Sequence, residues 1–425
     1  MLQTLRNAWR IEEIRKKILF TLLIVLLYRI GNAIPVPFVN TVLLQQYFAY
    51  LQNTALGLLD AMSGGSFSNA TIFALSIQPS INASIIIQLL CIAIPALERM
   101  SKDEGEEGRK KIASITRYST VAIGLLQGFG YYMLMRNNGI IVSEAASSVW
   151  AAIIIILTFT SGSALIMWLG EQITEFGIGN GISIILFASI ISRFPNSVIT
   201  TIQNVANGAL AWWAAVLVFL GALALIVLIV YVNDAERRIP VQYAKRVVGR
   251  KMYGGQSTHL PMKVNMSGVM PIIFASSISS IPATIAAFTG HSDSAWARTN
   301  TIPYAIIYLL LIIFFAYFYS TIQFNPIEVA NNLKKNGGYI PGFRPGKPTS
   351  EFIQKVLNKI TLFGAIYLGI IAVTPILVSH FSNAAALTGL SLGGTSIIIV
   401  VGVALETVRA IEAQMLMRNY KGFLS

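Results

Sequence analysis

Residues 214–232 read AAVLVFLGALALIVLIVYV, an unbroken apolar run. A helix of about 20 such residues crosses the roughly 30 Å hydrocarbon core of a bilayer. Asp234, Arg237 and Arg238 follow within a few residues, so the run stops at a charged loop. This stretch predicts a transmembrane helix, and with it a membrane protein.

Nine further segments of similar character complete the pattern. The ten predicted spans are residues 18–38, 72–97, 118–135, 149–170, 182–200, 211–232, 266–289, 302–322, 360–380 and 393–411. The composition agrees, because 55% of the residues are hydrophobic, 12% are charged and the mean hydropathy is +0.66. Such values are too apolar for a soluble domain. We therefore predict an all-α polytopic membrane protein with ten transmembrane helices.

Positive charge lies almost entirely in alternate loops. Lys and Arg crowd the N-terminus, the loops after the second, sixth and eighth spans, and the C-terminal tail. The opposite set of loops holds only Arg136, Arg193 and Arg298. This asymmetry is typical of the positive-inside bias and predicts both termini in the cytoplasm. It also explains the net charge of +13 without a nucleic-acid partner.

Ten spans with both ends on one side divide into two sets of five with inverted topology. We place the N-terminal half at residues 1–200 and the C-terminal half at 201–425. The single cysteine, Cys91, excludes an intramolecular disulfide. No small-residue cleavage site follows the first apolar run, so we expect that run to be an uncleaved first helix.

A long segment between the first two spans, residues 39–71, holds no Lys or Arg. Within it ALGLLDAM (55–62) is too short to span a bilayer and is followed by SGGS (63–66). A re-entrant or cavity-filling piece is one interpretation, because irregular backbone is tolerated at membrane depth only where protein or water satisfies it. A packed external half-helix is the other.

The second and seventh spans are half polar. Ser80, Ser84 and Gln88 recur every four residues and share one helix face, and Ile81 and Ile85 form the adjacent stripe. The seventh span carries a cluster of serines at Ser276, Ser277, Ser279 and Ser280. Such helices border a cavity or bond a neighbouring helix. Two of them together predict a seam that is able to open, although simple helix-to-helix bonding would explain the pattern as well.

The sequence lacks the motifs of enzyme chemistry. Its three histidines form no metal-binding pattern, and GIGNG (177–181) lacks the lysine and the preceding strand of a phosphate loop. We therefore expect a tight turn there, and we predict no catalytic residue, metal site or cofactor. A secondary transporter for a small solute and a membrane receptor without a pore stay open as alternatives.

Eight short motifs occur in order from residue 170 to residue 396. They are GEQITE (170–175), GIGNGIS (177–183), AKR (244–246), QSTHLPMKVN (256–265), FNP (324–326), NLKK (332–335), IPGFRPG (340–346) and GGTS (393–396). Together they resemble the SecY family of bacterial protein-conducting channels over essentially the whole chain. The resemblance implies an hourglass pore between two five-helix halves. Unfolded secretory proteins would cross it, and hydrophobic segments would leave sideways into the lipid.

The resemblance also implies functional residues. The pore ring of aliphatic side chains would be Ile81, Ile85, Ile182, Leu186, Ile273 and Ile399. The plug would be roughly residues 55–69. In it Leu58, Leu59 and Met62 would pack beneath the ring, and Gly64 and Gly65 would form a flexible connection. The lateral gate would lie between the second and seventh spans, beside the third and eighth, with Ser84, Gln88, Ser276 and Ser277 as candidate contacts.

The loops at 233–265 and 323–359 resemble those that receive a translocation motor or a ribosome. Their basic residues would pair with ribosomal RNA phosphates or acidic motor surfaces; the candidates are Lys245, Arg246, Arg250, Lys251 and Arg344. The resemblance implies the small subunits SecE and SecG, the ATPase SecA, the ribosome, signal-bearing preproteins and membrane lipids as partners. It places the chain in the bacterial cytoplasmic membrane.

Overall fold

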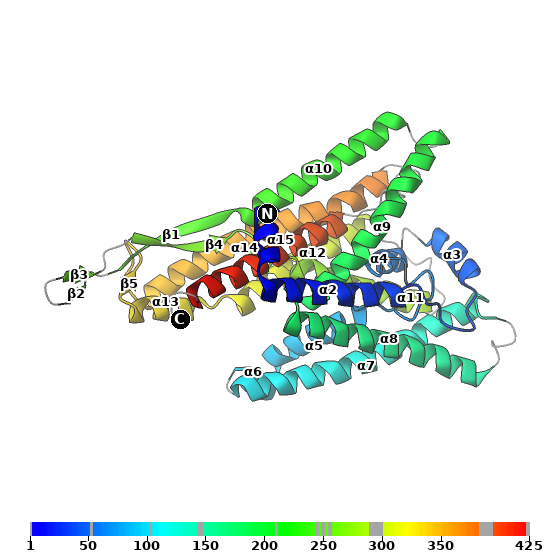
Figure 1. Cartoon of the computed structure of the whole chain (residues 1–425), viewed down its shortest axis with the longest axis horizontal. Helices are drawn as coiled ribbons and strands as arrows, with labels where there is room; N and C mark the ends of the chain where they lie inside the picture. The colour runs from blue at the N-terminus through cyan, green and yellow to red at the C-terminus, as the bar shows by residue number, and fades with distance from the viewer. Residues whose placement is uncertain are drawn as a thin grey trace.

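The computed structural model is mostly helical and describes residues 2–51, 54–102, 104–142, 148–208, 211–243, 246–248, 251–253, 257–288, 301–381 and 394–421. Most long helices run along the longest axis of the molecule (Figure 1). The helices in these residues are α1 (Leu2–Arg10), α2 (Glu12–Gly31), α3 (Thr41–Tyr50), α4 (Ala55–Met62), α5 (Gln78–Ala93), α6 (Pro95–Lys102), α7 (Gly105–Asn137), α8 (Val149–Phe176), α9 (Gly181–Ala206), α10 (Trp212–Asp234), α11 (Met270–Phe288), α12 (Ile302–Gln323), α13 (Pro326–Lys335), α14 (Lys347–Phe381) and α15 (Gly394–Lys421).

Each of the ten predicted spans contains a helix, namely α2, α5, α7, α8, α9, α10, α11, α12, α14 and α15. Within the described residues, α8, α9, α10, α12 and α14 are long and apolar enough to cross a membrane by length and composition. The apolar helices in α5 and α11 are shorter. The chain is therefore a multi-pass membrane protein.

Helix ends differ from the predicted spans mainly where proline intervenes. The first span was expected to reach residue 38, but α2 ends at Gly31, and Pro35 and Pro37 follow. Proline lacks the N–H that a helix interior needs and disfavours helix at the residue before it. The second span was expected from residue 72. Instead α5 begins at Gln78 with a proline in its first turn, and residues 72–77 form turns.

The loop between α10 and α11 contains strands, so the prediction of an all-α fold is wrong there. β1 (Glu236–Tyr243) pairs antiparallel with β4 (Ser257–Lys263) and with β5 (Gly338–Tyr339), and β2 (Arg246–Val248) pairs with β3 (Lys251–Tyr253). Ile239 and Val241 are buried between exposed neighbours, which is the period-two pattern of a strand. They form a small core with residues of α13 and α14.

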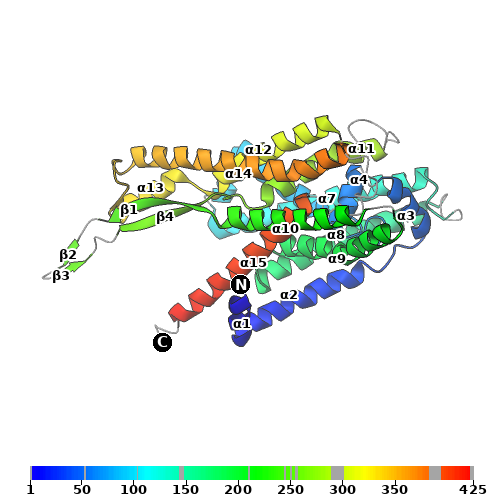
Figure 2. The same cartoon turned by 90° about the horizontal axis from the view of Figure 1, so that it is seen from above.

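Both chain ends lie toward the end of the helices from which β1 and β4 project (Figures 1 and 2). We call this end the strand end. Figure 1 places α6 and α13 there as well, and α3 at the opposite end. The segments that follow the second, sixth and eighth predicted spans thus gather at one end, as the charge pattern predicts.

Glycines allow α8 to touch neighbouring backbone. A Cβ on Gly162 would lie 2.0 Å from the carbonyl oxygen of Ile72, and a Cβ on Gly181 would lie 1.8 Å from that of Gly170. No real side chain fits at either distance, so α8 packs directly on the segment before α5 and on the first turn of α9. The expected tight turn at residues 177–180 connects α8 to α9.

The substitution Gly162→Ala tests the first of these contacts. The added methyl group collides with a backbone oxygen that moves only if α8 or the 71–77 segment shifts. Overpacking of this kind is expected to lower the free energy of unfolding by about 1–3 kcal/mol. Thermal unfolding of the purified chain in detergent measures the effect. Gly221→Ala in α10 is the matched control, because nothing lies within 4 Å of its added methyl group, and equal midpoints for the two variants would contradict the prediction.

Candidate functional site

Six aliphatic side chains from four helices lie in one large apolar core. They come from α5, α9, α11 and α15 and are the predicted ring residues Ile81, Ile85, Ile182, Leu186, Ile273 and Ile399. All six belong to one apolar cluster, which we call the central cluster. Five of them are at most 3% exposed, and Ile182 is partly buried at the edge. The six side chains therefore lie within the apolar interior of the fold.

The segment from α4 to Ala70 lies against the central cluster on the side away from the strand end. Met62 belongs to the cluster, as predicted. Leu59 instead packs against a second apolar cluster that includes Phe67 and Tyr131. The side chain of Leu58 lies outside the described residues. Of the predicted plug side chains that the structure describes, Met62 therefore packs in the central cluster and Leu59 against the second cluster.

Gly64 and Gly65 form a tight turn after α4. Both have left-handed φ angles, 72° and 85°, which glycine adopts at little cost. The Gly65 N–H donates to the Asp60 carbonyl at 2.9 Å, and the Tyr131 hydroxyl donates to the Phe67 carbonyl. The expected flexible connection is thus a hydrogen-bonded turn in this structure.

Helix α11 packs on α5 and α7, where the lateral gate was predicted. Ser277 Oγ donates across the seam to Gln78 Oε1 at 3.4 Å. The other predicted gate residues bond within their own helices. Ser276 donates to the Ile273 carbonyl at 2.9 Å, and Gln88 Nε2 donates to Ser84 Oγ at 3.2 Å.

A pocket of about 210 Å³ lies between the turn after α4 and helices α5, α7 and α11. Gln78, Asn82 and Ile86 line it from α5 at four-residue spacing, and Asn82 Oδ1 is buried without a hydrogen-bond partner in the described residues. Sequence reasoning followed the Ser80, Ser84, Gln88 series and missed this face. The signal was present, since Gln78 and Asn82 are also four residues apart.

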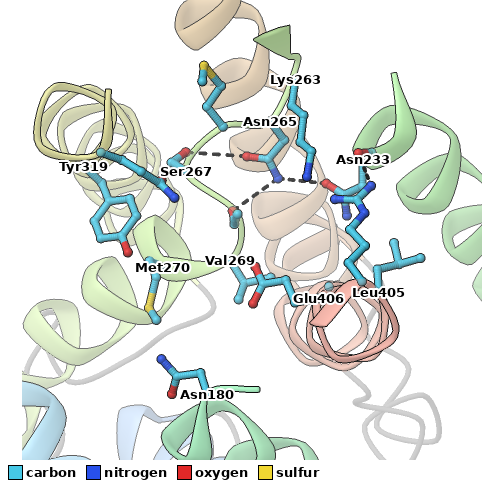
Figure 3. Close-up of a pocket in the computed structure, with 15 residues that line it drawn as sticks. Asn180, Asn233, Lys263, Asn265, Ser267, Val269, Met270, Tyr319, Leu405 and Glu406 are labelled. Carbon is cyan, nitrogen blue, oxygen red and sulfur yellow. Dashed lines mark hydrogen bonds between the residues drawn. The ribbon is translucent and has the colours of Figure 1, made fainter. Parts of the chain in front are cut away.

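A second pocket, of about 330 Å³, lies on the strand-end side of the central cluster (Figure 3). Its lining is polar and includes Asn180, Asn233, Lys263, Asn265, Glu406 and Arg409. Asn265 Nδ2 donates to Asn233 Oδ1 at 2.9 Å, and Arg409 donates to Asp234 Oδ1 at 2.6 Å. Burial and then the positive charge of Arg409 lower the pKa of Lys263, just beyond the end of the helices. A mostly polar pocket thus lies at the strand end, beside Val269 of the central cluster.

Among the basic candidates, Arg344 and the strands that carry Arg246 and Lys251 lie at the strand end (Figure 1). Arg344 is exposed in the turn between β5 and α14, where Thr349 Oγ1 donates to its carbonyl at 2.8 Å. Phe343 stacks on Phe352 at 4.2 Å between ring centroids, which ties the turn to α14. Arg246 and Lys251 lie in β2 and β3, but their side chains, like the whole of Lys245 and Arg250, are outside the described residues.

Comparison with known sequences identifies the family. The family model described as SecY matches residues 71–408. The chain is 45% identical over 441 residues to the protein translocase subunit SecY of Streptomyces scabiei and 43% identical over 446 residues to that of Mycobacterium tuberculosis strain H37Rv. In both cases the match covers 100% of each chain.

Solved structures agree in fold. One described as "The structure of a protein conducting channel" superposes with a TM-score of 0.63 at 17% identity and covers 95% of this chain and 93% of that one. Sec61 in the canine ribosome-channel complex superposes with a TM-score of 0.60 at 15% identity, and the match covers 95% of this chain and 93% of that one. The full-length sequence matches, the family model and the common fold together show that this chain belongs to the SecY family.

Proposed function

We propose that this chain is a channel that passes unfolded secretory proteins across the cytoplasmic membrane of a bacterium and releases hydrophobic segments sideways into the lipid. The observation that carries the proposal is that six aliphatic side chains from four helices share one apolar core, into which Met62 of α4 also packs. A mostly polar pocket lies beside that core at the strand end. A narrow apolar collar dewets and blocks ions. Its side chains offer no specific hydrogen bonds, so they suit substrates of varied sequence.

The central cluster draws its members from both proposed halves. Helices α5 and α9 belong to residues 1–200, and α11 and α15 belong to residues 201–425. A pore at the junction of two halves widens when the halves move apart, and ligand pathways between inverted repeats are common in membrane proteins. The six ring candidates would then line the constriction, and the chain itself would need no catalytic residue.

The plug and the lateral gate follow from the same arrangement. The segment 55–69 would close the pore from the side opposite the strand end and move aside during transport. The seam between α5 and α11 would open toward lipid. Hydrogen bonds between membrane helices contribute at most about 1–2 kcal/mol each, so one contact between Ser277 and Gln78 holds the seam only weakly. An apolar segment entering the neighbouring pocket would replace it.

The strand end would face the cytoplasm, since the basic segments and both termini lie toward it. The ribbon of β1 and β4 and the exposed Arg344 turn would bind the ribosome or the motor SecA. The ribosome-bound Sec61 structure supports the first of these partners. SecE and SecG would complete the complex within the membrane, as the family resemblance implies.

Cross-linking of a stalled preprotein tests the pore. The chain with Cys91→Ser and a single cysteine at position 85 or 273 would be reconstituted with SecE, SecG and SecA. We expect ATP-dependent disulfides between either cysteine and a preprotein that carries one cysteine. Val227→Cys, 68% exposed on α10, is the lipid-facing control and should stay unlinked.

The alternatives predict other results. Cysteines at 85 and 273 that stay unlinked while the preprotein crosses the membrane would refute the ring assignment. No transport with all partners present would favour the receptor or the small-solute transporter.

A disulfide across the seam tests the gate. Gln78→Cys with Ser277→Cys, in the Cys91→Ser background, replaces two side chains whose oxygens are 3.4 Å apart. We expect oxidation to join α5 to α11 and to stop membrane insertion of an apolar segment, and reduction to restore it. Each single cysteine variant is the control. Insertion at the parent rate by a fully oxidised double variant, shown by gel shift, would exclude opening at this seam.

A further inference from the structure

Arg193 was counted by sequence with the external loops, although it also falls within the predicted span 182–200, and the structure places it inside α9. Its Nη2 lies 2.8 Å from Oδ2 of Asp60, which belongs to α4. The Asp60 side chain is only 7% exposed, whereas that of Arg193 is 39% exposed. An ion pair with one buried and one half-exposed partner therefore joins the plug segment to a neighbouring helix.

Asp60 also organises the turn that follows α4. Its Oδ1 accepts a hydrogen bond from the Ser68 N–H at 2.7 Å, and its carbonyl accepts from the Gly65 N–H at 2.9 Å and the Ser63 hydroxyl at 3.0 Å. Both carboxylate oxygens are therefore used. Through Ser68 the carboxylate ties the end of α4 to the turn that follows it, and through Arg193 it ties α4 to α9.

The same turn touches α9 at a second point. Gly64 approaches α9 so closely that a Cβ would lie 2.8 Å from the Ser189 carbonyl oxygen. Ser189 and Arg193 are four residues apart and so lie on one face of the helix. The turn after α4 is thus seated on this face, and the ion pair is its one charged contact with α9 in the described residues.

We propose that Arg193 is a positioning residue for the plug segment, and that its ion pair with Asp60 holds α4 against α9 while the pore is closed. The inference rests on the proposed channel function. A buried carboxylate without its countercharge is strongly unfavourable. Asp60 is therefore stable in its buried site only while Arg193 faces it. Movement of α4 away from α9 separates the pair, and water can then hydrate both charges.

The unequal exposure of the partners gives the two single variants unequal effects. Arg193→Gln leaves a buried carboxylate without a countercharge, which favours displacement of α4 into water. Asp60→Asn leaves a half-exposed guanidinium that water can hydrate, and the new amide oxygen can still accept from Ser68. The double variant, Asp60→Asn with Arg193→Gln, removes the buried charge and should restore the seated plug.

Cysteine accessibility measures the position of the plug segment directly. Ser66 is 2% exposed, so Ser66→Cys in the Cys91→Ser background reports when the turn leaves its site. The full chain in nanodiscs would be treated with a membrane-impermeant maleimide. We expect Arg193→Gln to raise the labelling rate on the order of ten-fold or more, Asp60→Asn to raise it less, and the double variant to return it toward the parent.

Arg136→Gln is the matched control, because Arg136 is an exposed arginine at the end of α7. It should label at the parent rate. An unchanged labelling rate in Arg193→Gln would overturn the proposal. Equal rates in Arg193→Gln and the double variant would overturn it too, since the loss would then concern the size of the side chain and not its charge.

Ion release from vesicles separates this inference from the channel function. If the labelling rates follow the predicted order and Arg193→Gln vesicles also release ions, both proposals stand. If the labelling rates follow that order and no ions are released, the ion pair positions α4 but the apolar side chains keep ions out without it. The positioning role then holds, and the preprotein cross-links at positions 85 and 273 decide the channel function separately.

Discussion

Backbone N–H and C=O groups at membrane depth need partners inside the protein, because lipid offers none. The segment from Ser63 to Ile77 leaves the helical pattern and meets this requirement with its surroundings. Val36 N–H donates to the Ala70 carbonyl at 2.9 Å, and Ile72 N–H donates to the Ile34 carbonyl at 3.0 Å. This irregular segment is mostly buried among the helices, and Ser63, Phe67, Ala74 and Leu75 line the pocket between α4, α5, α7 and α11.

The regions around this segment differ in whether apolar or polar contacts hold them together. Helices α5, α9, α11 and α15 contribute aliphatic side chains to the central cluster, and such side chains have no directional bonds to break. The seam between α5 and α11 carries the long hydrogen bond from Ser277 to Gln78, at 3.4 Å. The plug turn carries the buried charge of Asp60. The α5–α11 seam and the turn after α4, which would have to move during transport, are thus held by a few polar contacts of modest strength.

Several features were readable from the sequence because they depend on neighbouring residues along the chain. Apolar length predicted ten helices, and basic loops predicted which connections share one end. The family resemblance supplied all six ring candidates, which lie in or against one apolar cluster, and their role in a ring stays a prediction. The strands were missed because Ile239 and Val241 alternate with exposed residues in a charged loop, which contains no continuous apolar run. Gln78 was missed because its partner, Ser277, is far away in sequence.

Length, hydropathy and charge belong to contiguous residues, and they were enough to establish a multi-pass membrane protein with its basic segments on one side. Contacts between residues distant in the sequence depend on how helices pack, and only the tertiary structure decided them. Arg193 shows the difference most clearly. In the sequence it is one external arginine among three, whereas in the fold its guanidinium meets a buried carboxylate on α4. The reason is physical, since the state of a charge depends on the burial and the partners that folding provides.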